Sequence, residues 1–190
     1  MADSTEARVI EHGGPAADGL LFFTPDSRTL VAAYPPDDII EYWDAATGRR
    51  TALLRVKRRP DEQLFAVSPD AMIMASANTG PPGPVILWDV ASQRRSKVFA
   101  ETAAGIVAIA FSPDRTTLAT GTMDGLLRLW NLASGSEVAT FSAHQSTCRS
   151  ISFSPDGRYL VTAGVDDTIK LWPAPTFAET DADLPPTRRP

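Results

Sequence analysis

Phe153-Ser154-Pro155-Asp156 is the last of four near-copies of one short phrase, and a tryptophan follows each copy. The three earlier copies are Phe23-Thr24-Pro25-Asp26, Val67-Ser68-Pro69-Asp70 and Phe111-Ser112-Pro113-Asp114. The tryptophans, spaced by 45, 42 and 42 residues, are Trp43, Trp88, Trp130 and Trp172. A period of about 40 to 45 residues is typical of proteins built from repeated supersecondary units. The chain is therefore predicted to consist of four stacked repeats.

Each repeat is expected to hold four short strands, as its third copy shows best. Residues 105–111 are almost wholly apolar, which is typical of a strand covered on both faces. Ser112-Pro113-Asp114 suits a type I turn, and residues 117–122 form the next strand before a turn at 123–125. Apolar and polar residues then alternate over 127–130 and again over 137–141. This pattern predicts a small antiparallel sheet.

A single sheet of this size cannot bury two apolar faces by itself. Neighbouring sheets can cover each other when they stack around an axis, as the blades of a β-propeller do. The sequence therefore predicts an all-β fold.

The repeats resemble those of the WD-repeat β-propeller family. That family ends the third strand of a blade in Trp-Asp, which occurs here as Trp43-Asp44 and Trp88-Asp89 and is replaced by Trp130-Asn131 and Trp172-Pro173 in the later copies. The resemblance covers roughly residues 8 to 174. It implies a β-propeller of four WD-type blades, each with four antiparallel strands, either as a small closed ring or as an open partial propeller.

The expected organisation has a disordered N-terminus, a propeller and a disordered Pro-rich tail. These segments are residues 1–6, residues 7–174 and residues 175–190, and the repeats within the propeller are about 7–55, 56–100, 101–142 and 143–174. In the family, the outer strand of a blade precedes the next repeat, and no alternating segment follows Trp172. The last blade should therefore lack its outer strand, and the strand-like residues 7–11 are a candidate to complete it. The alternatives are an open arc, a larger ring of two chains, or a piece of a longer product.

The resemblance also implies a buried hydrogen-bonded set within the blades. The fourth copy matches it fully, through His144, Thr162, Asp166 and Trp172. The third copy has the threonine, aspartate and tryptophan without a histidine. In the second, a Gly/Pro-rich segment at 79–84 interrupts the pattern.

Composition and motifs argue against several functions. With 18 Lys and Arg against 23 Asp and Glu, the net charge is −5, so no overall field attracts nucleic acid. No stretch is long and apolar enough to span a membrane. The chain lacks phosphate-loop and nucleophile-elbow motifs, and its two His and one Cys are too few for a usual zinc site. We expect a protein with no catalytic residues, no cofactor and no metal, located in the cytoplasm.

Two local groups of residues could be interpreted as catalytic, but each also has a structural interpretation. His144 and Cys148 are close enough in sequence for a base and a nucleophile, yet they are expected to be a blade residue and a buried strand residue. The acidic pairs Asp37-Asp38 and Asp166-Asp167 fall in turns, where one carboxylate is expected to cap backbone groups and the other to be solvated.

One basic cluster is the candidate partner-binding site: Arg55, Lys57, Arg58 and Arg59. It lies in the connection between two blades, on the face where the family commonly binds partners. Four positive charges there suit an acidic or phosphorylated peptide. The alternative is a solvated loop that improves solubility.

The function predicted from the sequence is that of a non-catalytic scaffold for protein–protein interaction, which binds protein partners but neither nucleic acid nor membrane. The alternative is a regulatory or sensor fragment of a larger multi-domain WD-repeat protein that completes its ring by oligomerising. In that case the chain forms a homo-oligomer.

Overall fold

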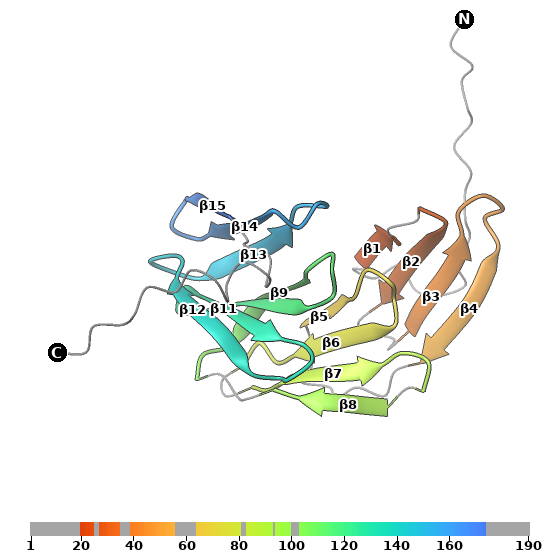
Figure 1. The fold of residues 1–190 in the computed structure, drawn as a ribbon, viewed down its shortest axis with the longest axis horizontal. Helices are drawn as coiled ribbons and strands as arrows, with labels where there is room; N and C mark the ends of the chain where they lie inside the picture. Colours follow the sequence, from red (N-terminus) through yellow and green to blue (C-terminus); the bar gives the residue numbers. More distant parts are fainter. Residues whose placement is uncertain are drawn as a thin grey trace, which may run out of the picture.

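The computed structural model describes residues 20–24, 27–34, 39–55, 64–80, 83–92, 94–99 and 103–173. These residues form fifteen strands in four antiparallel sheets, and no helix occurs among them (Figure 1). We call the sheets blades 1 to 4 in chain order. The all-β prediction is confirmed.

Strands in each blade follow one another in sequence, so each blade is a simple meander. Blade 1 contains β1 (Leu20–Phe23), β2 (Thr29–Tyr34), β3 (Ile39–Asp44) and β4 (Arg50–Arg55). Blade 2 contains β5 (Leu64–Val67), β6 (Ile73–Ala77), β7 (Val85–Asp89) and β8 (Arg94–Val98). Blade 3 contains β9 (Ile106–Phe111), β10 (Thr117–Thr122), β11 (Leu126–Asn131) and β12 (Glu137–Ser142). Blade 4 contains β13 (Cys148–Phe153), β14 (Tyr159–Gly164) and β15 (Ile169–Pro173).

The recurrent Ser-Pro-Asp phrase encodes the turn between the first two strands of a blade. In blade 4 the Ser154 hydroxyl donates to Asp156 Oδ1 at 2.6 Å and accepts the backbone N–H of Tyr159 at 2.9 Å. Blades 2 and 3 repeat both contacts. The residue after the aspartate has a left-handed backbone in all four blades, with φ of 57° at Ser27, 59° at Ala71, 62° at Arg115 and 71° at Gly157.

The core lies between successive blades rather than within any one of them. Each tryptophan stands opposite an apolar residue on the neighbouring strand, for instance Trp130 opposite Leu118. We call the side of a blade that carries its tryptophan the Trp face and the opposite side the back face. The buried clusters join the Trp face of one blade to the back face of the blade before it, as where Trp88 packs with Val31 and Ile40.

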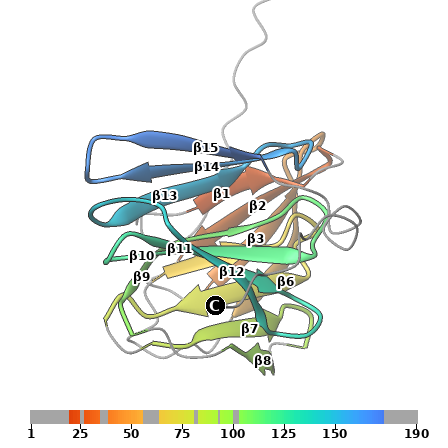
Figure 2. The ribbon, with the colours of Figure 1, turned by 60° about the vertical axis from the view of Figure 1, so that its left-hand side comes forward.

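The stack is open. Blades 1 and 4 lie at the two ends of an arc, and no sheet formed by the described residues joins them (Figure 1). Blade 4 has three strands in the described part of the chain, as predicted, and β15 forms its outer edge (Figure 2). Of the two predicted forms, the structure is therefore the open partial propeller. The strand predicted at residues 7–11 lies outside the described residues, as do the termini 1–6 and 175–190, which were predicted to be disordered.

Candidate functional site

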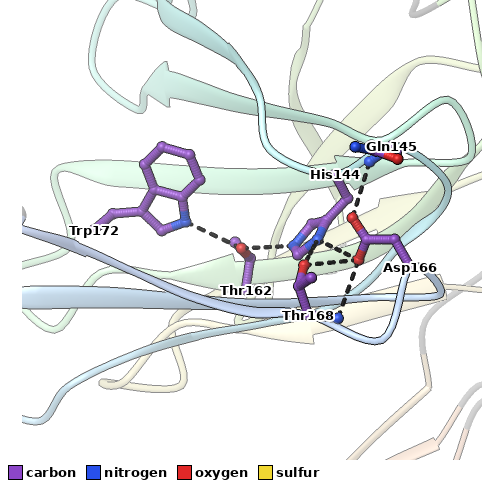
Figure 3. A network of polar contacts seen from close by, with 6 residues as sticks. All are labelled: His144, Gln145, Thr162, Asp166, Thr168 and Trp172. Atoms are coloured by element: carbon purple, nitrogen blue, oxygen red, sulfur yellow. Dashed lines mark hydrogen bonds and ion pairs between the residues drawn. The ribbon is translucent and has the colours of Figure 1, made fainter.

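Blade 4 contains a continuous chain of polar contacts that links its third strand to the loop before its first strand (Figure 3). Trp172 Nε1 lies 3.0 Å from Thr162 Oγ1, which lies 2.9 Å from His144 Nε2. On the other side of the imidazole, Nδ1 lies 2.9 Å from Asp166 Oδ1. The structure thus brings together the four residues that the family resemblance implied.

The contacts define one direction of hydrogen bonding. A carboxylate only accepts hydrogen bonds, so the Nδ1–H of His144 donates to Asp166. Nε2 then accepts from the Thr162 hydroxyl, whose oxygen in turn accepts the indole N–H of Trp172. A neutral imidazole satisfies every member, which is the condition under which a buried polar network makes its surroundings rigid.

Two residues that sequence reasoning did not single out complete the aspartate's surroundings. The backbone N–H of Gln145 donates to Asp166 Oδ2 at 3.0 Å, and the Thr168 hydroxyl donates to Oδ1 at 2.8 Å. The Gln145 bond is the main influence that lowers the pKa of Asp166. Burial opposes it, while Thr168 and His144 lower the pKa further. A hydroxyl two residues after a turn aspartate is the sequence signal that points to Thr168.

Close backbone approach holds the histidine in place. A Cβ on Gly164 would stand 2.4 Å from His144 Nδ1, so only glycine leaves room for the ring. Gly125 in blade 3 has φ of +84°, and its carbonyl accepts the backbone N–H of His144 at 3.0 Å. The network of blade 4 is therefore anchored to a turn of blade 3.

The other blades keep parts of this network. Trp88 donates to Ser76 at 2.8 Å and Trp130 donates to Thr120 at 2.9 Å. In blade 1 the register places Ala32 at the position of these hydroxyls. Ala32 cannot bond to Trp43, so blade 1 departs from the common arrangement.

The structure favours the interpretation of His144 as a blade residue and of Cys148 as a buried strand residue over that of a base and a nucleophile. Both ring nitrogens of His144 are already engaged within the network. Cys148 is fully buried, and burial in the first place, then the charge of Asp166, raises the pKa of its thiol to about 11. A thiol with such a pKa is a poor nucleophile near neutral pH.

The two aspartates in the acidic turn of blade 4, Asp166 and Asp167, have different surroundings. Asp166 is engaged in the network, whereas Asp167 is exposed and has a φ of 59°. Asp37 and Asp38 lie outside the described residues. Within the described ranges, no group of three or more His, Cys, Asp or Glu side chains is placed to hold a metal ion. Those ranges also contain no helix with the length and apolar character needed to cross a membrane.

Of the basic cluster, the structure describes Arg55, while Lys57, Arg58 and Arg59 lie outside the described residues. Arg55 is exposed at the end of β4, opposite Ile39, the first residue of β3. In blade 3 the same end of the outer strand leads directly to Ala143 and His144. Arg55 therefore lies at the end of the stack that also carries the loops of the His144 network.

Loops at this end are bonded to one another across blades 3 and 4. The Thr147 hydroxyl donates to the carbonyl of Met123 at 3.1 Å, and the Val165 N–H donates to the carbonyl of Thr147 at 3.0 Å. We call the loops at residues 123–125, 143–147 and 165–168 the loop platform. Met123 and Val165 are about half exposed on it, at 47% and 52%. The platform thus exposes apolar side chains on loops whose backbone is held by hydrogen bonds between blades 3 and 4.

Comparison with known proteins agrees with this architecture. Residues 93–131 and 135–173 each match the family model "WD domain, G-beta repeat". The solved structure of U3-55K is similar over 87% of this chain, with 24% sequence identity and a TM-score of 0.63. The matched region covers 51% of the U3-55K chain, so the present chain spans about half of its length. No curated protein matches the sequence.

Proposed function

This chain is a WD-repeat protein, and we propose that it acts as a non-catalytic scaffold that binds other proteins through its loop platform. The observation that carries the proposal is the linkage of the platform to the buried His144 network. Gln145 and Asp166 belong to the platform, and their mutual hydrogen bond continues into the blade through His144 and Thr162.

Rigidity is the physical basis of this function. A protein surface loses conformational entropy when it binds, and ordering each mobile side chain costs about 0.5–1.5 kcal/mol. Loops that are already held by backbone hydrogen bonds lose less. The exposed Met123 and Val165 then provide apolar contact area from a backbone that loses little further entropy on binding.

The partner class that best fits this end of the stack is an acidic or phosphorylated protein segment. The support is the exposed Arg55 at the same end as the platform, followed in sequence by Lys57, Arg58 and Arg59. Guanidinium groups bind carboxylate and phosphate through paired hydrogen bonds. We further propose that this binding takes place in the cytoplasm.

Capture from the native host tests the scaffold function. Tagged wild-type chain is compared with a platform variant, Met123→Asp with Val165→Asp, and with a matched control, Arg158→Glu, an exposed position beside the Ser-Pro-Asp turn. Partners should be lost from the platform variant and retained by the control. Equal capture by all three proteins would contradict the assignment of the platform.

The acidic partner class has its own test. The fourfold charge reversal Arg55→Glu, Lys57→Glu, Arg58→Glu and Arg59→Glu should abolish capture at low salt, and raising the salt concentration should weaken binding to the wild type. Partner binding that is unchanged by the fourfold reversal would remove the basic cluster from the binding site while leaving the platform assignment intact.

A second candidate function rests on the open arc. We propose that the chain completes a ring through its two end blades, as a regulatory or sensor portion of a larger assembly would. The support is the span of the chain, about half of the U3-55K structure, together with the two ends of the stack that no described blade covers.

A further inference from the structure

The back face of blade 4 is an unfilled blade interface. Ile169 stands opposite Ala163 in the register, at the position that Ile40, Val85 and Leu127 hold in blades 1, 2 and 3. Those three side chains are 2%, 0% and 1% exposed, whereas Ile169 is 76% exposed. The same side chain position is therefore fully covered wherever a following blade exists and open where none does.

A second position on this face behaves in the same way. Leu171 stands opposite Val161, as Leu87 stands opposite Ala75 in blade 2. Leu87 is 3% exposed and Leu171 is 65% exposed. The register places Ser150, Ser152, Tyr159, Val161 and Ala163 beside Ile169 and Leu171 on the back face, and the exposed Arg149 lies at the bulge between Cys148 and Ser150. The part of the face around Ile169 and Leu171 is thus an exposed apolar patch of the kind that marks an interaction site.

The Trp face of blade 1 supplies the other half of such an interface. Phe23 and Leu21 occupy the positions of Phe111 in blade 3 and Ile151 in blade 4, judged by their partners on the second strand. Phe111 and Ile151 are 8% and 9% exposed between blades. Phe23 and Leu21 are 59% and 67% exposed.

We propose that a second copy of this chain covers both end faces, so that the back face of blade 4 in one copy packs against the Trp face of blade 1 in the other. This inference deepens the ring-completing function proposed above and names its partner. Every interface inside the stack joins a back face to the next Trp face, and the contact between copies continues that series unchanged.

Two copies rather than many follow from the length of the arc. A head-to-tail contact either closes into a ring or propagates as a filament. Two arcs of four blades, related by a twofold axis, together supply eight blades for one ring. Eight blades lie within the range of known propellers. Each copy then buries both of its open faces.

Sedimentation of the purified full chain is the first test. The expected species has twice the chain mass of 20.4 kDa at micromolar concentration. A monomer at all concentrations would overturn the proposal, because another segment or another protein would then have to cover the faces. A series of larger species that grows with concentration would overturn the closed ring.

Variants at the exposed positions identify the two faces. The tail variant carries Ile169→Glu and Leu171→Glu, and the head variant carries Leu21→Glu and Phe23→Glu. Each should weaken dimerisation by at least about 100-fold, because the new carboxylates would be buried without partners. The control variant, Val98→Glu with Val138→Glu, introduces the same charge change on outer strands. Val98 is 57% exposed and Val138 is 49% exposed, so this variant should remain dimeric.

Mixing the tail and head variants distinguishes the head-to-tail contact from a symmetric one. Each variant alone should be monomeric, and the equimolar mixture should form a heterodimer through its one intact pair of faces. A head variant that still dimerises alone would show a tail-to-tail contact and contradict the proposal. Circular dichroism of each variant confirms that it is folded. These assays contain no partner protein, so their failure would leave the scaffold function standing.

Discussion

The indole nitrogen of Trp172 and the hydroxyl oxygen of Thr162 lie 3.0 Å apart, and the same hydroxyl lies 2.9 Å from His144. One small side chain thus joins a tryptophan on β15 to a histidine in the loop before β13. This junction connects the packing of blade 4 to the loop platform above it.

Replacing Thr162 with valine preserves the shape of the side chain and removes the junction. Thr162 is fully buried, so the His144 Nε2 and the Trp172 N–H would lose their partner in a place that water does not reach. We expect Thr162→Val to lower the free energy of unfolding by about 2–4 kcal/mol. Urea unfolding followed by circular dichroism measures this loss. The control Thr51→Val removes an exposed hydroxyl and should change stability by less than about 0.5 kcal/mol.

Acid should weaken the fold through Asp166. The pKa of Asp166 is lowered below its ordinary value of 3.8, so the native state favours the charged form. A lowered native pKa contributes stability above the unfolded-state value, and that contribution is lost as the pH falls through about 4 and below. We expect the urea concentration at the unfolding midpoint of the wild type to decrease as the pH is lowered from 6 to 3. Asp166→Asn should be less stable at pH 6 and should lose less on acidification; an identical pH dependence would contradict this assignment.

Glu41 in blade 1 is a buried carboxylate with one partner. Arg50 Nη1 donates to its Oε1 at 2.7 Å, while Oε2 is buried without a hydrogen-bond partner among the described residues. The corresponding position in blade 2 is Ile86. We expect Arg50→Met to cost about 1–3 kcal/mol, since it leaves the carboxylate unpaired. The double variant Glu41→Ile with Arg50→Met should regain that stability in thermal unfolding, and failure to regain it would show that Arg50 stabilises the blade by another route.

The residue after each turn aspartate has a left-handed backbone, and only blade 4 has glycine there. A Cβ on Gly157 would meet only Pro113, at 3.9 Å, so Gly157→Ala tests backbone conformation rather than packing. We expect it to lower stability by about 1 kcal/mol. Ser27→Gly should raise stability by about 0.5 kcal/mol, because relief of the left-handed strain exceeds the entropy cost of glycine. Ser27→Ala retains the Cβ and serves as the control; a gain from that variant as well would contradict the explanation.

The spacing of the tryptophans was sufficient to predict four repeats, and the residues between them predicted most strand positions. Local alternation and turn residues determine the strands, so residues 117–122 were identified with the bounds that the structure gives to β10. The three strands that blade 4 has among the described residues were also predictable, because proline follows Trp172 and no alternating segment comes after it.

The features that the sequence did not predict depend on how segments from different parts of the chain approach one another. Gly164 leaves room for the His144 ring, and Gly125 accepts a hydrogen bond from the next blade; neither role has a local signature. The choice between a closed ring and an open arc depends on the angles between blades, which no short motif encodes. The left-handed backbone at Arg115 could not be predicted either, because a residue other than glycine occupies that position.

Thiol labelling at one position shows whether the blade 4 end of the stack is open. Ile169→Cys is compared with Val85→Cys, its counterpart in blade 2, at a protein concentration low enough to keep the chain monomeric. The native Cys148 contributes little, because it is buried and its thiol pKa is raised to about 11. We expect the thiol at 169 to react like a free cysteine and at least about 100-fold faster than the thiol at 85, which becomes reactive only when the structure opens locally. Equal protection of both thiols at that dilution would show that the last blade is covered within a single chain, and would contradict the open arc.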